Sequence, residues 1–505
     1  MWRIYENCMQ RIIDLANDTR IYEVASVTPL SFAPQLSKRV CNRIYLKRED
    51  KLAIHTFKLR GAYQKISNLS AEQASKGVVA SSAGNHAQGV ALSAKKLGIS
   101  AIIVMPFSTP RIKVKAVEQL GAKVVLHGDV YDDAYQYAKQ LEKSQDLVFI
   151  HAFDDVEVMA GQATIAKELL EQLPSMDKVF IPVGGGGLIA GMATYIKHYA
   201  PNIKVIGVEP EDSPTLYQAL KNNKRVVLKD VGRFADGVAV KQIGEQTYPI
   251  AKQVVDEVIL VSNDEICTAI KDIYEDVRSI AEPAGALATA GVKKYIENNN
   301  IKNENIVSIV SGANVNFDRL RYISERADLG GHNEAIIAVT IDEKPGSFLT
   351  FCQMLDNHAI TEFNYRFGSD AQARIFVGVA LNEGLSEKKA LLDKLSKSFD
   401  VLDMSDNSIA KTHIRYMVGG RANCKNEVIY RFEFSERPGA LLNFLKKIGS
   451  YWNISLFHYR NHGADFGRVL IGLQASDASK LEQKFDELGY FYQNETNNKA
   501  YQYFL

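Results

Sequence analysis

Short runs of β-branched and other apolar residues alternate with longer amphipathic segments from about residue 76 to residue 320. This alternation is typical of a parallel sheet with crossover helices, in which the buried strands read as nearly continuous apolar runs. The amphipathic segments include Arg111–Leu120, Val156–Leu170 and Asp264–Arg278. The expected strands are Gly77–Ala80, Ala101–Met105, Lys123–Leu126, Leu147–Ile150, Lys178–Val183, Val205–Val208, Glu257–Val261 and Ile306–Val310. This part of the chain is therefore predicted to be α/β.

The pattern changes after Arg319. The segment 320–329 reads as a helical neck, Gly330-Gly331-His332-Asn333 is a plausible break, and a different alternation begins at Ala335. We place a domain boundary near residue 330.

The last third of the chain contains an internal repeat. The segment Glu343–Leu349 recurs 93 residues later as Glu436–Leu442, and Asn364-Tyr365-Arg366 recurs 94 residues later as His458-Tyr459-Arg460. Each copy reads as a strand, a Pro-Gly loop, a helix and two strands, which predicts two ferredoxin-like units. An alternative is that the copies only form an oligomerisation surface. The expected domains are 1–330, with a smaller subdomain inserted at about 56–150, then 331–410 and 411–505.

The composition excludes several classes of protein. Among 505 residues, 46% are hydrophobic and 24% are charged, which is globular usage rather than disorder. The net charge of +1 supplies no basic field for nucleic acid. We find no secretory signal and no apolar run near the roughly 20 residues of a membrane span. The five cysteines are scattered, which argues against disulfides and a zinc site. We therefore expect a cytoplasmic protein without nucleic-acid or membrane partners.

Four consecutive glycines form the strongest local motif. Gly184, Gly185, Gly186 and Gly187 follow an expected strand, and a helix-like segment begins near Leu188. Backbone N–H groups and a helix N-terminus at such a place favour an anion, most naturally a phosphate. The run has neither the lysine of a P-loop nor the spacing of a dinucleotide site. We therefore predict that it holds the phosphate of a bound cofactor.

A second loop, Ser81–Gly89, also lies between an apolar strand and a helix. Its small residues and Asn85 offer donors to a carboxylate or a phenolic oxygen at a helix N-terminus. His86 is explained equally well as a helix-start residue without a catalytic part.

Lys58 lies between Phe57 and Leu59. Apolar surroundings lower the pKa of a lysine, which suits Schiff-base chemistry. Most lysines are solvated surface groups, so the assignment of a functional role to Lys58 depends on these flanking residues and on the other motifs.

Ser311-Gly312-Ala313-Asn314 ends the last expected strand, at the edge where open α/β sheets bind ligands. The hydroxyl of Ser311 is able to hydrogen-bond a ring nitrogen without forcing its protonation. An ordinary turn explains the same residues.

These motifs, together with Glu282-Pro-Ala-Gly-Ala, resemble in their order the pyridoxal-phosphate enzymes of fold type II, the tryptophan-synthase-β type. The duplicated tail makes the chain most similar to the biosynthetic threonine dehydratases, also called threonine ammonia-lyases. The resemblance covers nearly the whole chain, from about Tyr5. It implies an α/β catalytic region of two subdomains, followed by an α+β region of two ACT-like units.

The resemblance also implies pyridoxal 5'-phosphate as the cofactor and a role for each motif. Lys58 would hold the cofactor as a Schiff base and remove the Cα proton of the substrate. Asn85 would hydrogen-bond the phenolic oxygen, Gly184–Leu188 would hold the phosphate, and Ser311 would face the pyridine nitrogen. The residues expected to bind the substrate carboxylate are Ser82, Ala83, Gly84, Asn85 and His86.

The implied reaction is β-elimination from L-threonine, which yields 2-oxobutanoate and ammonia for isoleucine synthesis, with a side activity on L-serine. Isoleucine as inhibitor, valine as its antagonist and a homotetramer are further implications. The residues expected to line the effector site, although the apolar ones would serve equally as core, are Gly346, Phe348, Leu349, Asn364, Gly439, Leu441, Leu442 and His458.

Several alternatives remain at this stage. Serine racemases and serine dehydratases share the catalytic motifs, but the racemases carry a serine where this chain has Ala83. The divalent-cation site of the family looks incomplete, because Glu209 lacks a second acidic residue at the matching place in 211–215. We therefore expect no divalent metal and leave a monovalent ion open. A catalytically silent amino-acid sensor is the alternative from another class, against which Lys58 and Ser311 argue.

Overall fold

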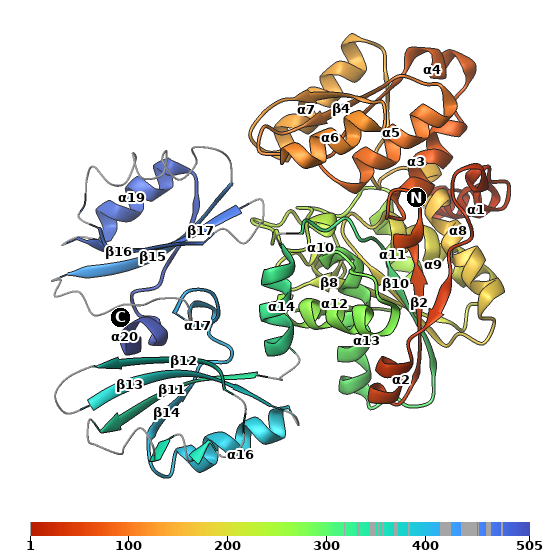
Figure 1. Ribbon diagram of the computed structural model, residues 1–505. Helices are drawn as coiled ribbons and strands as arrows, with labels where there is room; N and C mark the ends of the chain where they lie inside the picture. Colours follow the sequence, from red (N-terminus) through yellow and green to blue (C-terminus); the bar gives the residue numbers. More distant parts are fainter. Residues whose placement is uncertain are drawn as a thin grey trace. The chain divides into compact units, whose positions relative to one another are not determined.

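The computed structural model describes residues 2–317, 319–330, 334–342, 350–351, 354–355, 358, 360–367, 372–381, 384–414, 426–435, 452, 454–460, 466–475 and 478–504. They form two compact units, Met1–Val315 and Asn316–Leu505, which are described separately. Figure 1 shows both, coloured along the chain.

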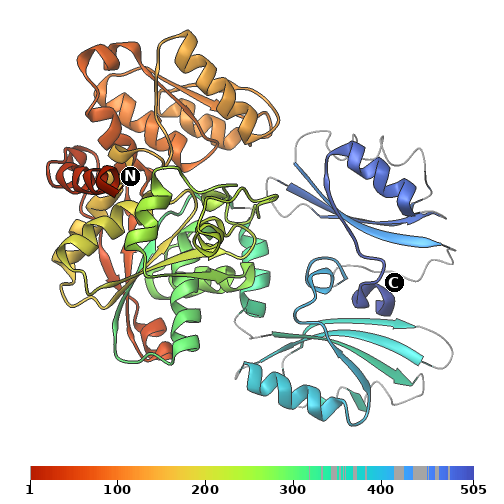
Figure 2. The same ribbon diagram turned by 180° about the vertical axis from the view of Figure 1, so that it is seen from behind.

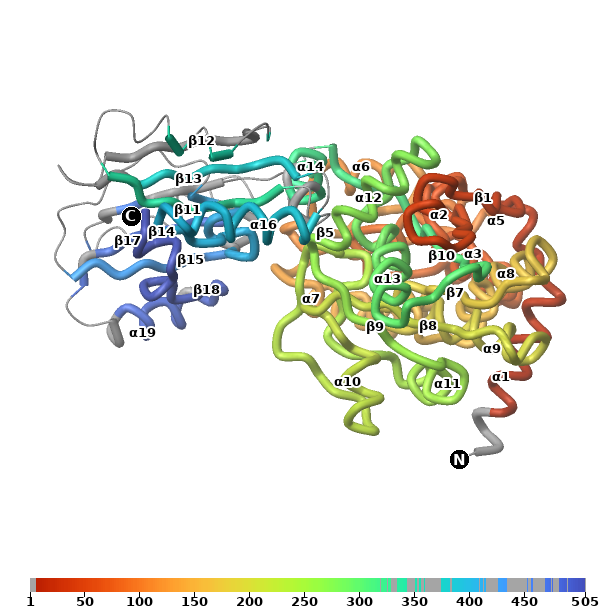
Figure 3. Tube along the Cα trace, turned by 90° about the horizontal axis from the view of Figure 1, so that it is seen from below, coloured from red at the N-terminus to blue at the C-terminus, as the bar shows by residue number. Residues whose placement is uncertain are grey.

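A six-stranded sheet forms the centre of the first unit. Its order is β1 (Leu30–Phe32), β2 (Arg43–Arg48), β10 (Asn305–Val310), β7 (Lys178–Pro182), β8 (Lys204–Pro210) and β9 (Glu257–Val261). Strand β1 runs antiparallel to β2, and the other pairs are parallel. In Figure 3, β9, β8, β7 and β10 follow one another across this sheet.

A second, parallel sheet has the order β5 (Lys123–Leu126), β4 (Ala101–Met105), β3 (Val78–Ser81) and β6 (Val148–Phe149). Its strands lie in the chain between β2 and β7 of the larger sheet. All eight strands expected from the sequence are present in the two sheets, whereas β1 and β2 were not expected.

Helices cover both faces of the larger sheet, which Figure 2 shows from behind. Val179 and Ile181 belong to one core cluster with residues of α8 and α9, whereas the ring of Phe180 packs against Tyr295 of α13. Successive strand side chains point to opposite faces, so these helices lie on opposite sides of β7. The helices of the unit are α1 (Trp2–Asn17), α2 (Pro34–Val40), α3 (Lys58–Ser67), α4 (Ala71–Lys76), α5 (Asn85–Leu97), α6 (Arg111–Gln119), α7 (Tyr131–Ser144), α8 (Val156–Gln172), α9 (Gly187–Tyr199), α10 (Thr215–Asn222), α11 (Thr247–Val254), α12 (Asn263–Val277) and α13 (Pro283–Asn299), with short 3-10 turns η1 (Ile21–Glu23), η2 (Glu49–Lys51) and η3 (Asp236–Val238).

Helices α3 and α8 approach each other at backbone distance. A Cβ added to Gly161 would lie 2.6 Å from the Cα of Gly61, so a side chain there would force the helices apart. Lys65 of α3 also pairs with Asp155, the N-cap of α8, at 3.0 Å and with Glu157 at 2.8 Å. The N-terminus of α8 is thereby held close to the last turn of α3.

The second unit contains two four-stranded antiparallel sheets. The first has the order β12 (Ile360–Phe367), β13 (Gln372–Ala380), β11 (Glu334–Asp342) and β14 (Asp400–Asp403), and the second β16 (Ile454–Arg460), β17 (Phe466–Gln474), β15 (Glu427–Ser435) and β18 (Phe491–Asn494). Their helices are α14 (Arg319–Gly330), α16 (Leu385–Leu395), α17 (Ser408–Thr412), α19 (Ala478–Leu488) and α20 (Lys499–Phe504). Both sheets carry a register shift at matching places, between Ile360 and Glu362 and between Ile454 and Leu456. The α+β duplication predicted from the repeat is therefore present.

The two copies share a core and a polar contact. Ile336 and Phe376 of the first sheet pack in one cluster with Ile429 and Leu470 of the second. Asn407 and Asn498, which begin α17 and α20, bond to each other at 3.1 Å. The copies thus pack against each other as an equivalent pair.

The first residues after the catalytic motifs belong to the second unit. The two units divide between Val315 and Asn316, so α14 groups with the second unit. The reason is packing, since the guanidinium of Arg468 in β17 lies over the ring of Tyr322 in α14. Among the described residues, no helix is long and apolar enough to cross a membrane.

Candidate active site

Lys58 begins α3 beside the end of β10. The N–H of Phe57 donates to the carbonyl of Ser311 at 3.1 Å, and Thr56 forms a bridge with Gly312. The Nζ of Lys58 donates to the carbonyl of Ala152 at 3.0 Å. Two motifs far apart in the sequence and the loop before α8 therefore meet at one amine.

The environment of this amine changes its acidity. Desolvation lowers the pKa of Lys58 to about 8, and the charge of Glu282 partly offsets this effect. Near neutral pH, far more of such an amine is uncharged than of an exposed lysine. An uncharged amine is the form that condenses with an aldehyde.

The four glycines connect β7 to α9, as predicted, and their neighbours leave no room for side chains. A Cβ at Gly185 would lie 2.3 Å from the ring of Phe153, and one at Gly187 would lie 2.7 Å from the carbonyl of Phe153. Gly186 has a φ of +90°. Because Phe153 follows Ala152, the same loop contacts both the glycines and Lys58.

Two hydroxyls fix the carbonyl groups of the glycine loop. Thr215 Oγ1 donates to the carbonyl of Gly184 at 2.8 Å, and Thr247 Oγ1 donates to that of Gly185 at 2.7 Å. Gly186 is the N-cap of α9 and supplies no side-chain cap. The first N–H groups of α9 lack intrahelical acceptors, as at every helix start. This cradle, which a Cβ would fill, fits a phosphate.

The loop after β3 leads into α5 in the predicted way. Gly84 is the N-cap and supplies no side-chain cap, while its N–H donates to Ser82 Oγ at 3.2 Å. Ser82, Ala83, Gly84 and Asn85 are all partly exposed. The first turn of a 13-residue helix is thus open to an anion such as a carboxylate.

His86 differs from its neighbours because its side chain is buried. Its Nε2 lies 2.9 Å from the carbonyl of Ile150. Burial, with a contribution from the charge of Lys58, lowers the pKa of His86 to about 3, so the ring stays neutral at physiological pH. Its imidazole therefore acts as a core residue at the start of α5.

The side chain of Asn85 lies within a chain of hydrogen bonds. Its Nδ2 donates to Glu282 Oε1 at 2.6 Å, and its Oδ1 accepts from Asn314 Nδ2 at 2.8 Å. The Cβ position of Gly237 lies 4.0 Å from Nδ2, and a Cβ at Gly184 would lie 2.9 Å from Val238. The turn η3 therefore lies close both to the side chain of Asn85 and to the glycine loop.

Ser311 is buried at the end of β10. Its hydroxyl donates to the carbonyl of Ala284 at 3.2 Å. The hydrogen bond from the N–H of Phe57 to its carbonyl places Ser311 next to the segment that carries Lys58.

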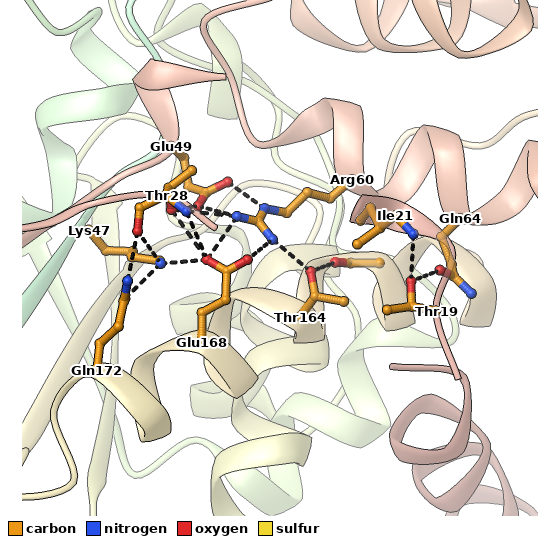
Figure 4. A network of polar contacts seen from close by, with 11 residues as sticks. Thr19, Ile21, Thr28, Lys47, Glu49, Arg60, Gln64, Thr164, Glu168 and Gln172 are labelled. Carbon is orange, nitrogen blue, oxygen red and sulfur yellow. Dashed lines mark hydrogen bonds and ion pairs between the residues drawn. The ribbon is translucent and has the colours of Figure 1, made fainter. Parts of the chain in front are cut away.

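A buried polar network that was not expected from the sequence lies behind the start of α3 (Figure 4). Arg60 is fully buried and bonds to Glu49 at 2.7 Å and to Glu168 at 2.6 Å. The Nζ of Lys47 donates to Glu168 at 2.5 Å and to the carbonyl of Thr28 at 2.8 Å. The network therefore joins β2, η2 and α8 to the helix that presents Lys58. Its only sequence signal was a basic residue two positions after Lys58.

Glu209 is fully buried and caps α10. Its carboxyl group accepts from the backbone N–H groups of Leu216 at 2.7 Å and Tyr217 at 2.9 Å and lies 2.9 Å from Thr215 Oγ1. Desolvation raises the pKa of Glu209 to about 7. The role of this residue in the described structure is thus a helix cap that also orients Thr215 toward the glycine loop.

Most of the expected effector residues lie outside the described residues: Gly346, Phe348, Leu349, Gly439, Leu441 and Leu442. The other two lie in equivalent strands. Asn364 of β12 pairs with Phe376, and His458 of β16 pairs with Leu470. The effector site stays a prediction.

Comparison with known proteins agrees with this geometry. Residues 21–312 match the model of the pyridoxal-phosphate-dependent enzyme family, and residues 325–414 and 418–505 match the C-terminal regulatory domain of threonine dehydratase. The biosynthetic L-threonine dehydratase of Pasteurella multocida is 54% identical over 492 residues, which cover 96% of this chain and 96% of that relative. The biosynthetic L-threonine dehydratase of Escherichia coli is 52% identical over 488 residues, which cover 96% of this chain and 95% of that relative.

Solved structures agree with the sequence comparisons. Processed threonine deaminase isoform 2 of Solanum lycopersicum is 48% identical, with a TM-score of 0.63, over 64% of this chain and 88% of the other. Maize serine racemase is 33% identical, with a TM-score of 0.58, over 61% and 95%.

The fold and the site therefore define a pyridoxal-phosphate-dependent enzyme of fold type II, and the cofactor expected from the sequence is confirmed. Within that class, the chain belongs to the family of biosynthetic threonine dehydratases and carries their C-terminal regulatory domain.

Proposed function

We propose that the chain deaminates L-threonine to 2-oxobutanoate and ammonia, the first committed step of isoleucine biosynthesis. The observation that carries this proposal is the amine of Lys58, 3.0 Å from the carbonyl of Ala152, on the loop that packs against the glycine cradle. Pyridoxal phosphate supplies a conjugated ring that delocalises the negative charge left at Cα when its proton is removed.

Each of the predicted residues has a defined task in this proposal. Gly184–Leu188 hold the phosphate through backbone N–H groups, Asn85 donates to the phenolic oxygen, and Ser311 faces the ring nitrogen. Lys58 holds the cofactor covalently at rest and, when the amino acid takes its place, accepts the Cα proton at Nζ. Its pKa of about 8 supports a base that works near neutral pH.

The substrate carboxylate binds at the first turn of α5, with Ser82, Ala83, Gly84, Asn85 and His86 supplying the loop. The helix start without a side-chain cap at Gly84 supports this placement. Since the imidazole of His86 contacts Ile150, we assign His86 its backbone N–H only.

The reaction balances without an added reagent. Removal of the Cα proton and departure of the β-hydroxyl release one water, and hydrolysis of the resulting free enamine consumes one water. L-Serine has the same reacting groups and is the expected side substrate. Racemisation needs an acid on the opposite face of Cα, and Ala83 has no titratable group there.

Isoleucine inhibits the enzyme through the C-terminal region and valine opposes it, in a cytoplasmic homotetramer. The matched regulatory domain and the paired sheets support this proposal. An effector that prefers one arrangement of the region changes activity by its difference in affinity, typically about 1–3 kcal/mol. The proposed domains are a catalytic region at 1–330, with its smaller subdomain at about 56–150, and two regulatory units at 331–410 and 411–505.

The test has two readouts. The purified protein should show a visible absorption band that borohydride abolishes. The band should be absent from Lys58→Ala and present in Lys51→Ala, a control at an exposed lysine. Release of 2-oxo acid from threonine and from serine is then measured with and without isoleucine. A colourless wild-type protein would favour a sensor, whereas a threonine rate that ignores isoleucine would refute the regulatory part alone.

A further inference from the structure

The amide of Asn85 lies between two groups of opposite hydrogen-bonding character. Glu282 Oε1 accepts from Asn85 Nδ2 at 2.6 Å. On the other side, Asn314 Nδ2 donates to Asn85 Oδ1 at 2.8 Å. The same Nδ2 of Asn314 also donates to the carbonyl of Ile54 at 2.8 Å, so both of its hydrogens are used.

These partners permit only one orientation of the Asn85 amide. A side-chain amide that rotates by half a turn exchanges its oxygen and its NH₂ group. The rotated amide of Asn85 would place an oxygen against the Glu282 carboxylate and an NH₂ group against that of Asn314. Both contacts would be repulsive, and Glu282 is only 4% exposed, so water cannot compensate.

We propose that Asn314 and Glu282 are positioning residues that hold the Asn85 amide with one N–H directed to the phenolic oxygen of the cofactor. The proposal rests on the proposed contact between Asn85 and that oxygen. The Nδ2 of Asn85 carries two hydrogens, of which Glu282 accepts one. The second is left for the cofactor, and the amide needs no reorientation when the cofactor binds.

The sharpest variant is Asn314→Asp, which keeps the shape of the side chain and removes its donors. A carboxylate oxygen then faces Asn85 Oδ1 and favours the rotated amide. We expect the apoprotein to bind pyridoxal phosphate about tenfold more weakly, the effect of one lost hydrogen bond to a charged acceptor. The position of the visible band should also shift, since the phenolic oxygen is part of the absorbing ring. Glu282→Gln, whose amide is able to donate or accept, should show a smaller effect of the same kind.

A matched control separates positioning from general destabilisation. Asn42 is also buried and donates through Nδ2 to the carbonyls of Val40 at 2.7 Å and Ile301 at 2.8 Å, remote from the motifs of the site. Asn42→Asp should lower the melting temperature and leave the band position and the cofactor affinity unchanged.

A double-mutant cycle tests whether Asn314 acts through Asn85. In an Asn85→Ala background, Asn314→Asp should no longer change the cofactor affinity, because no amide remains to be oriented. An equal loss in both backgrounds would overturn the proposal and show that Asn314 acts through Ile54. Wild-type affinity and band position in the single variant would overturn it as well. In either case, a wild-type band that borohydride abolishes would leave the proposed function standing.

Discussion

Replacement of Arg60 by methionine should destabilise the first unit strongly without touching Lys58. All five N–H groups of the guanidinium have acceptors in the described structure. Nε and Nη2 bond to Glu49 at 2.7 and 2.9 Å. Nη1 and Nη2 bond to Glu168 at 2.6 and 3.1 Å, and Nη1 also bonds to Thr164 at 2.9 Å. Methionine fills a similar volume and makes none of these bonds.

The cost follows from the charges left behind. Without Arg60, the buried carboxylate of Glu168 keeps its contact with Lys47 at 2.5 Å, whereas that of Glu49 loses its ion pair. Removing one partner of a buried ion pair costs about 3–5 kcal/mol, since the other charge loses its compensation in a place without water. At roughly 2–4 °C for each kcal/mol in a large domain, the melting temperature should fall by about 6–20 °C.

The assay is thermal loss of the visible cofactor band at one fixed scan rate, which keeps irreversible unfolding comparable between variants. Arg20→Met is the matched control, because Arg20 also pairs with a carboxylate, that of Glu23 at 2.8 Å, but the two side chains are 57% and 48% exposed. An exposed pair is worth about 0–1 kcal/mol, so this control should shift the transition by no more than about 4 °C. If Arg60→Met melted together with Arg20→Met, the buried network would not carry the stability assigned to it.

Three further outcomes are expected. The rate at which the apoprotein takes up pyridoxal phosphate is measured against pH and divided by the rate at which a simple alkylamine reacts with it. This ratio should show that Lys58 loses its proton near pH 8. At pH 7.5 its neutral fraction should exceed that of an ordinary lysine about two hundredfold, and a midpoint above pH 10 would contradict the burial argument. Gly185→Ala would bring a methyl group 2.3 Å from the ring of Phe153. Equilibrium dialysis should therefore show cofactor binding that is weaker by at least about tenfold. Unchanged binding would mean that the loop moves to make room for the methyl group. Asn407→Ala removes a helix cap and the bond to Asn498, and should cost about 1–2 kcal/mol in urea unfolding of the full chain. Asn222→Ala, on an exposed helix surface, should cost less than about 0.5 kcal/mol, and an equal cost of the two substitutions would contradict the role of the cap.

The order of the motifs along the chain was enough to predict the fold class and the cofactor. Apolar runs of strand length mark buried strands, and the carboxyl ends of parallel strands lie along one edge of a sheet. The residues that follow β3, β7 and β10 were therefore expected to lie near one another. The repeat in the last third could also be recognised, because both copies keep the same Pro-Gly pair and nearly the same spacing.

Contacts between distant parts of the chain could not be read in this way. The contact of Ala152 with Lys58, the packing of Phe153 on the glycines and the bond from Asn314 to Asn85 each join segments with no shared periodicity. In the sequence, Arg60 cannot be told from any other basic residue. Its two carboxylate partners, Glu49 and Glu168, lie near it only in the folded structure. A local pattern records which face of an element is apolar. Which element packs on that face, and which polar groups are buried together there, depends on the close packing of the whole unit.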